Sequence, residues 1–268
     1  MISSYKSSGT LIIICLCLII MTGIHCKRGA DLATVESKVT VLYSSDEYLL
    51  GPGDSLASRL LVFLPLVSWI NIGELQPKLA ERWDHSDDYR TWTFYLRKDV
   101  KWHDGVSVTA HDIKFTIDLW KHPDVNYYVW GIESVALIDE FSFSVTLKVP
   151  KDVPRNVLNF WEGFYPRDLL KDLDPKEFYE WDFWTHPVGN GPYRYVRHVP
   201  KVMMELEANP DYYLGEPKIK RIIFKFAKAS GTALTELLSG NVDILTYVDR
   251  IKILELAGDQ RFRAYHNW

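Results

Sequence analysis

The sequence contains little cysteine, and all of it lies near the N-terminus. The three cysteines are Cys15, Cys17 and Cys26. Residues 27–268 can therefore form no disulfide, and their stability has to come from a hydrophobic core. With 47% hydrophobic residues and 10 tryptophans, the chain has enough apolar side chains for such a core. The same composition excludes low-complexity disorder.

Long runs of a single charge are also missing. The 31 basic and 35 acidic residues give a formal net charge of −4. The densest basic group, from Lys218 to Lys228, alternates with isoleucine and phenylalanine, as on a strand with one solvated face. Binding to nucleic acids or anionic membranes requires clustered Lys and Arg, so the sequence predicts no nucleic-acid partner.

Motifs for enzymatic chemistry are absent as well. The sequence has no G-x-S-x-G elbow, no H-E-x-x-H pair and no P-loop. Gly189-Asn190-Gly191 has the glycines of a phosphate loop, but a strand beginning at Pro192-Tyr193 follows it, whereas phosphate binding needs a helix N-terminus. We interpret it as a loop that passes close to another segment. Glu205 and Glu207 alternate along a predicted strand and are expected to face solvent. We predict no catalytic residue.

Two His-Asp pairs, His103-Asp104 and His111-Asp112, are the candidate metal ligands. A turn separates them, only His111 lies on a predicted helix, and no cysteine is near to complete a site. The alternative is that Asp104 is a turn residue and Asp112 caps the helix. We therefore predict neither a metal nor a cofactor.

The N-terminus has the pattern of a secretory signal. Lys6 precedes an unbroken apolar run from Leu11 to Met21. That run is shorter than the ~20 residues needed to span a bilayer. We predict a signal peptide over residues 1–26 and an exported product in the periplasm or at the cell surface.

The signal is predicted to be of the lipoprotein type, with Cys26 as the lipidated residue that anchors the protein to the membrane. His25 is larger than the residue usual before such a cysteine, so ordinary signal cleavage stays the alternative. Residues 27–38 are short and polar, and we expect them to form a tether.

The most informative stretch begins with a strand pattern. Trp92, Phe94 and Leu96 alternate with smaller or more polar residues, which predicts a strand with one face on a core. Asp104-Gly105 is a turn sequence.

A helix is predicted after that turn. Thr109 stands three residues before Asp112, the spacing of a capping box. The i, i+4, i+7 stripe of Ile113, Ile117 and Trp120 forms its core face, and His122-Pro123 ends it. The other expected elements are a first strand at 39–43, a helix capped by Asp54 or Ser55 that continues to Phe63, a hairpin at 132–147, strands at 193–196, 202–207, 219–226 and 242–247, a helix at 232–239 closed by Gly240, and a short helix from Asp249.

This region resembles the signature of the extracytoplasmic solute-binding proteins of ABC importers for oligopeptides, dipeptides or nickel. The family pattern W-T-F-x-L-R-x-x-V-K-W-x-D-G-x-x-V-T-A-x-D fits residues 92–112 almost throughout. Segments 186–196 (HPVGNGPYRYV), 207–213 (EANPDYY) and 237–244 (LLSGNVDI) resemble further family segments in the family's order. The resemblance covers residues from Val39 to about Tyr265.

The resemblance implies an α/β (mixed α+β) fold: a lobe of the periplasmic-binding-protein type with an inserted subdomain. We expect residues 39–76 and 188–268 to form the main lobe and residues 77–187 the subdomain. Family members are longer, and their second lobe begins roughly where this sequence stops, so the resemblance implies that this lobe is absent here. Whether the chain is a fragment or a natural truncation stays open.

Aromatic residues outside any regular period are candidates for a binding cleft, because they offer flat apolar walls with polar tips; core packing is the alternative. Other candidates match, by position, family segments that face the cleft. The predicted ligand-binding residues are Asp54, Ser55, Tyr127, Tyr128, Trp130, Tyr247 and Asp249.

The function that the resemblance implies is non-catalytic. The protein would capture a small solute, an oligopeptide in our interpretation, outside the cytoplasmic membrane and deliver it to the permease subunits of an ABC transporter. The alternatives are a truncated, non-transporting remnant of such a protein and a secreted hydrolase. The absence of a nucleophile–base motif argues against the hydrolase.

Overall fold

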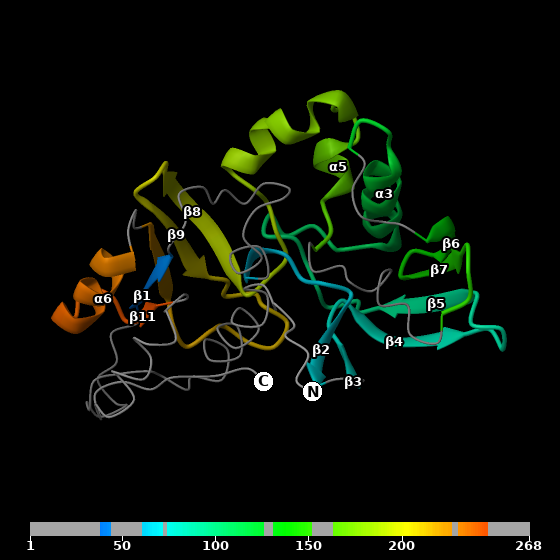
Figure 1. Cartoon of the computed structure of the whole chain (residues 1–268). Helices are drawn as coiled ribbons and strands as arrows, with labels where there is room; N and C mark the ends of the chain where they lie inside the picture. The colour runs from blue at the N-terminus through cyan, green and yellow to red at the C-terminus, as the bar shows by residue number, and fades with distance from the viewer. Residues whose placement is uncertain are drawn as a thin grey trace, which may run out of the picture.

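The computed structural model describes residues 38–43, 61–71, 74–125, 131–151, 163–226 and 230–245. Figure 1 shows the two larger sheets side by side, with helical segments above them. The fold is mixed α/β, as predicted. In chain order the described elements are β1 (Lys38–Tyr43), β2 (Val67–Asn71), β3 (Glu74–Pro77), β4 (Ala80–His85), β5 (Thr91–Leu96), α3 (Ala110–Lys121), β6 (Ile132–Asp139), β7 (Ser142–Leu147), α5 (Arg167–Leu170), the 3₁₀ helices η2 (Pro175–Glu180) and η3 (Asp182–Thr185), β8 (Tyr193–Val199), β9 (Met203–Ala208), β10 (Arg221–Phe226), α6 (Ser230–Ser239) and β11 (Ile244–Leu245).

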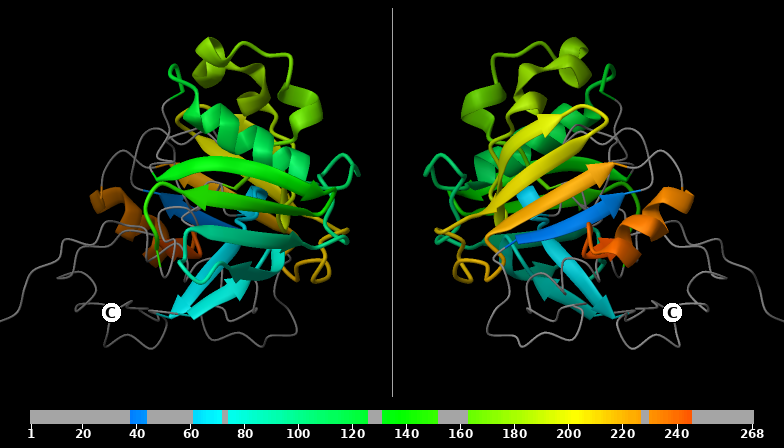
Figure 2. Two further views of the ribbon diagram at one scale, coloured as in Figure 1. Left: turned by 90° about the vertical axis from the view of Figure 1, so that its right-hand side faces the viewer. Right: turned by 90° about the vertical axis from the view of Figure 1, so that its left-hand side faces the viewer.

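The first sheet has five strands in the order β11-β1-β10-β9-β8. β1 runs parallel to both of its neighbours, β10 and β11, and lies beside β10 in the right-hand view of Figure 2. β9 and β8 complete the sheet as an antiparallel hairpin. The chain passes from β10 through α6 to β11 on the other side of β1. The carboxyl ends of β1, β10 and β11 therefore lie along one edge of the sheet.

The second sheet is antiparallel, with the order β4-β5-β7-β6, and contains the predicted signature strand. Trp92 pairs with Val145, and Phe94 pairs with Phe143 at a ring-centroid distance of 5.4 Å. The expected alternation of β5 is confirmed, because Trp92, Phe94 and Leu96 are all buried. In Figure 2, α3 lies across this sheet.

The capping box predicted for α3 is present, and it also joins α3 to a distant segment. One oxygen of the Asp112 carboxylate accepts the Thr109 N–H at 2.8 Å, and the other accepts the Arg167 N–H at 2.9 Å. One turn later, the Thr116 hydroxyl accepts the Tyr165 N–H at 2.9 Å. The helix ends at Lys121, as the following His-Pro pair predicted. Asp112 is therefore a structural cap partner that also positions residues 165–167.

The short helices α5, η2 and η3 lie between β7 and β8 in the chain. An aromatic cluster forms there around Tyr165, Phe178, Trp181 and Trp184, and its contacting ring centroids lie 5.1–6.4 Å apart. The buried side chains of both sheets and of this cluster belong to one continuous hydrophobic core. The division into a main lobe and an inserted subdomain stays a prediction. Among the described residues, no helix is both long and apolar enough to cross a membrane.

The sequence did not predict β2, β3 or β4. β2 and β3 form a separate two-stranded sheet with an irregular register, and β4 is a largely exposed edge strand with a bulge in its pairing to β5. None of the three therefore shows a regular period-two pattern.

The expectation that Glu205 faces solvent is wrong. Its side chain is 1% exposed and forms ion pairs with Arg197 on β8, at 2.8 Å, and with Arg221 on β10. Alternation along β9 correctly placed Glu205 away from the apolar core, but it could not show that arginines from both neighbouring strands cover the carboxylate.

We predict that Phe94→Ala destabilises the protein by about 3–5 kcal/mol, because it removes a fully buried ring that stacks on Phe143. Denaturant unfolding of the full chain measures the effect. The control is Thr93→Ala, one residue away on the opposite, partly exposed face of β5, which should change stability by less than about 1 kcal/mol. Similar losses for the two variants would contradict the assignment of the core face.

Candidate functional site

All the residues predicted to bind ligand lie outside the described residues, as does Cys26. Four of them nevertheless belong to segments that follow strands of the five-stranded sheet, on the side where the carboxyl ends of β1, β10 and β11 lie. Asp54 and Ser55 follow β1 in the chain, and Tyr247 and Asp249 follow β11. In open sheets with parallel strands, ligands bind outside the carboxyl ends of those strands. The structure thus describes the frame of a candidate site, which we call the carboxyl edge.

One side of the carboxyl edge is fixed where β11 begins. The Thr40 N–H donates to the Asp243 carboxylate at 2.7 Å, and the Asp243 N–H donates to the Thr40 carbonyl at 2.9 Å. Leu42 and Val242 pack together beside α6. The expected helix end at Gly240 is present, with a positive φ of 79°. These contacts set the direction in which the chain enters β11, the strand that Tyr247 follows in the sequence.

A second support lies where residues 189–191 cross the end of a helical turn at Leu61–Val62; we call this contact the glycine crossing. The Asn190 and Gly191 N–H groups both donate to the Val62 carbonyl, at 3.0 and 2.8 Å. The Asn190 side-chain oxygen accepts the Leu64 N–H at 2.8 Å. The segment 44–60, which includes Asp54 and Ser55, therefore has described anchors at both ends: β1 and the glycine crossing.

The glycine crossing leaves no space for side chains. A Cβ atom on Gly189 would lie 2.0 Å from the Val62 carbonyl oxygen, and one on Gly191 would lie 2.4 Å from that of Leu61. The interpretation of Gly189-Asn190-Gly191 as a loop that passes close to another segment is confirmed. These glycines are required because the two backbones touch.

The opposite side of the glycine crossing is held by His103, from the turn after β5. The His103 N–H donates to the Gly189 carbonyl at 2.7 Å, and the Gly189 N–H points at Nδ1 of the imidazole at 3.2 Å. Nε2 lies 3.1 Å from the Gly191 carbonyl oxygen. Since a carbonyl only accepts and an N–H only donates, the ring is the neutral tautomer with its proton on Nε2. Burial lowers the pKa of His103 from 6.5 to about 4, and the nearby Arg194 adds to this effect.

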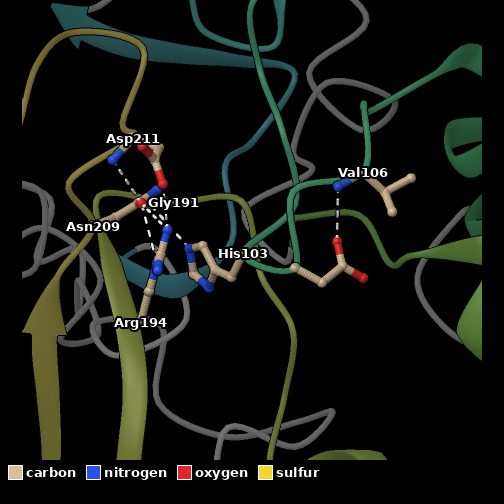
Figure 3. A network of polar contacts seen from close by, with 7 residues as sticks. His103, Val106, Gly191, Arg194, Asn209 and Asp211 are labelled. Atoms are coloured by element: carbon tan, nitrogen blue, oxygen red, sulfur yellow. Dashed lines mark hydrogen bonds and ion pairs between the residues drawn. The ribbon is translucent and has the colours of Figure 1, made fainter.

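Asn209, at the end of β9, completes this network. Figure 3 shows His103 and Asn209 converging on the Gly191 carbonyl, which accepts the Asn209 side-chain N–H at 3.1 Å. The Asn209 oxygen in turn accepts from Arg194 at 2.8 and 3.1 Å, and Arg194 pairs with the exposed Asp211 at 2.9 Å. Sequence reasoning identified these motifs but not the contacts between them.

The two His-Asp pairs that were candidate metal ligands do not come together into one site. Both ring nitrogens of His103 face backbone groups, Asp104 accepts the Val106 N–H of its own turn at 3.0 Å, and Asp112 caps α3. His111 lies exposed on α3. In the part of the chain that the structure describes, no three His, Cys, Asp or Glu side chains are arranged as metal ligands.

A family model described as "Bacterial extracellular solute-binding proteins, family 5 Middle" matches residues 74–266, which is most of the chain. The chain belongs to this family. Family 5 consists of solute-binding proteins rather than hydrolases, so the secreted-hydrolase alternative is wrong.

Three similar proteins illustrate what family 5 contains. A protein named as an ABC transporter peptide-binding protein of Brucella ovis is 30% identical over 208 residues, covering 75% of this chain and 39% of its own length. The periplasmic oligopeptide-binding protein OppA of Haemophilus influenzae is 29% identical, with 73% and 39% covered. The crystal structure of NikZ from Campylobacter jejuni, in complex with Ni(L-His), is 27% identical with a TM-score of 0.74, covering 84% of this chain and 46% of that one. The chain thus spans about two fifths of the length of the curated relatives it matches.

We predict that Gly191→Ala destabilises the protein by about 3 kcal/mol or more, because the added methyl group would overlap the Leu61 carbonyl and the two backbones would have to move apart. Thermal and denaturant unfolding measure the loss. Gly215→Ala is the control, because Gly215 has a φ of +89° and open space around its Cβ position. It should cost only about 1–2 kcal/mol, from backbone strain alone. Equal costs would show that contact between the backbones is not the reason for Gly191.

Proposed function

We propose that this chain is part of the solute-binding component of an ABC importer, which captures peptides outside the cytoplasmic membrane and delivers them to the permease subunits. The observation that carries this proposal is the family 5 match over most of the chain. Two of the similar proteins are named for binding peptides. A nickel–histidine complex is the second candidate ligand, since the NikZ structure contains one.

The carboxyl edge is the proposed ligand-binding region. Asp54 and Ser55 would contact ligand from the segment between β1 and the glycine crossing, and Tyr247 and Asp249 from the segment after β11. Extended peptides can be held through their own backbone hydrogen bonds, while side-chain pockets supply specificity. We propose Tyr127, Tyr128 and Trp130, between α3 and β6, as an aromatic wall.

The proposed organisation keeps residues 39–76 and 188–268 as the main lobe and residues 77–187 as the inserted subdomain. Two features support it: the five-stranded sheet is made from β1 and β8–β11, and the four-stranded sheet from β4–β7. We also propose a signal peptide over residues 1–26, lipidation at Cys26 and a short tether over residues 27–38, which would hold the binding lobe near the membrane.

Ligand binding by the full chain is tested with a mixed tri- to pentapeptide library, with trialanine as a defined probe and Ni(L-His) as the competing candidate. We predict that Tyr247→Ala weakens peptide binding about tenfold or more, or about 1.4 kcal/mol, because it removes an aromatic contact. Tyr179→Ala is the matched control, since Tyr179 is an exposed tyrosine on η2 and should leave affinity unchanged. Binding of Ni(L-His) but of no peptide would identify the second candidate as the ligand, and binding of neither would refute the proposal.

The anchor has a separate test in a bacterial host. We expect the unaltered protein to fractionate with membranes and Cys26→Ser to be released from them, because the substitution removes the thiol that would carry the lipid. Mass spectrometry of the mature N-terminus is the direct measurement. An unmodified N-terminus at a position other than Cys26 would exclude lipidation while leaving export intact.

A further inference from the structure

The glycine crossing contains the only Asn-Gly dipeptide in the sequence, Asn190-Gly191. In such a dipeptide the backbone nitrogen of the glycine can attack the asparagine side chain, because glycine has no side chain of its own to obstruct the approach. Asn209, in the same hydrogen-bond network (Figure 3), precedes Pro210, whose nitrogen carries no proton and cannot react in this way. One network therefore contains an asparagine that can modify itself and one that cannot.

The reaction needs only this dipeptide and water. The Gly191 nitrogen loses its proton to solvent and bonds to Cγ of Asn190, while the Cγ–Nδ2 bond breaks and Nδ2 leaves as ammonia. Water then opens the five-membered succinimide ring. Cleavage of the bond between the ring nitrogen and Cγ gives aspartate, and cleavage at the backbone carbonyl carbon gives isoaspartate, whose main chain runs through the former side chain and is a methylene group longer. One water is consumed, one ammonia is released, and nothing is oxidised or reduced.

The closed crossing holds both reacting groups in hydrogen bonds that oppose this reaction. The Gly191 N–H donates to the Val62 carbonyl at 2.8 Å, so the attacking nitrogen keeps its proton and its direction. The Asn190 side-chain oxygen accepts the Leu64 N–H at 2.8 Å, which fixes the amide that would be attacked. Asn190 is also only 1% exposed, which keeps water from the reacting atoms. The reaction therefore requires the crossing to open, and the bonds that must break belong to the reacting groups themselves.

The closed crossing accommodates neither product. Among the described residues, Nδ2 of Asn190 has no hydrogen-bond partner, so in the aspartate product a charged oxygen would be buried there without a partner. In isoaspartate, the longer main chain would displace the Asn190 and Gly191 N–H groups that now converge on the Val62 carbonyl. The backbones already touch, since even a Cβ on Gly191 would lie 2.4 Å from the Leu61 carbonyl oxygen. Conversion of Asn190 therefore opposes closure of the crossing.

We propose that Asn190 is a self-modification site that the closed glycine crossing protects. When the crossing opens, Asn190 loses ammonia to the attack of Gly191, and the resulting aspartate or isoaspartate prevents the crossing from closing again. The crossing thus converts a transient opening of the fold into a permanent chemical change. This inference goes beyond the proposed function and does not rest on it, because it involves only the atoms of the crossing and water.

Incubation of the full chain at pH 7.5 and 37 °C, in native buffer and in unfolding guanidinium, tests the site and its protection. Peptide mass spectrometry measures aspartate and isoaspartate at position 190 over time. We expect conversion in the unfolded chain and about a hundredfold slower conversion in the folded chain, because opening breaks three hydrogen bonds, each of which shifts an equilibrium by roughly two- to tenfold.

Two controls identify the chemistry. Asn209 should stay unmodified in both conditions, because a proline follows it. In guanidinium, Gly191→Ala should convert more slowly than the wild type, because its methyl group obstructs the attacking nitrogen and folding plays no part there. An unmodified Asn190 in the unfolded wild type would overturn the assignment of the site, and equal rates in the folded and unfolded chains would overturn its protection.

The consequence of conversion is measured with Asn190→Asp, which introduces the aspartate product directly. We expect its thermal midpoint at pH 7.5 to lie about 6 °C or more below that of the wild type, because the new charge is buried without a partner. A buried carboxyl keeps its proton to higher pH than an unfolded one, so the difference should shrink at pH 4.5. Asn241→Asp, at an exposed asparagine, is the control and should shift the midpoint by less than about 2 °C.

Equal midpoints for Asn190→Asp and the wild type at pH 7.5 would show that the crossing accepts the product and would overturn the second half of the inference. If Asn190→Asp does not fold at either pH, partly converted wild-type chains are refolded from guanidinium and treated with protease. The modified peptide should then be enriched in the protease-sensitive fraction, and an equal share in the resistant fraction would overturn the inference in the same way.

Discussion

The glycine crossing is the contact on which the arrangement of the described structure depends most. Two backbones meet there without side chains between them, and one carbonyl, that of Val62, accepts hydrogen bonds from two successive amides. The crossing brings together the turn after β5, the start of β8, the end of β9 and the chain that returns from segment 44–60. Its stability comes from satisfying buried backbone groups, each of which would cost about 1–3 kcal/mol if left unpaired.

His103 at the crossing and Glu205 in the adjacent sheet show two ways in which this fold accommodates titratable side chains that are partly or fully buried. His103 is kept neutral, and its two nitrogens are matched to one backbone donor and one backbone acceptor. Glu205 is instead paired with Arg197 and Arg221 from the neighbouring strands. Burial lowers the pKa of His103, because a charged ring would lose hydration there, and the nearby Arg194 lowers it further.

Sequence patterns predicted the parts of the fold in which local chemistry and tertiary packing agree. The strand of Trp92 and Phe94, the capping box of Asp112 and the helix end at Gly240 all have short-range signals that the structure confirms. Sequence patterns did not predict a residue's environment where segments distant in the chain determine it. Nothing near Glu205 in the chain shows that Arg197 and Arg221 will cover it, and nothing near Asn209 shows that its amide will meet the Gly191 carbonyl.

The same distinction explains why the chain reveals its family more readily than its ligand. The recognisable motifs lie at the Trp92 strand, the Asp112 cap, the glycine crossing and Asn209, where they solve packing problems common to the family's fold. Four of the proposed ligand-binding residues lie outside those motifs, in segments that follow β1 or β11 in the chain: Asp54, Ser55, Tyr247 and Asp249. Such segments can change side chains without disturbing the frame, because their ends are fixed by β1, β11 and the crossing. A chain built in this way can share its frame with both an oligopeptide-binding protein and a structure holding Ni(L-His), because loop segments can differ between proteins that keep the same scaffold.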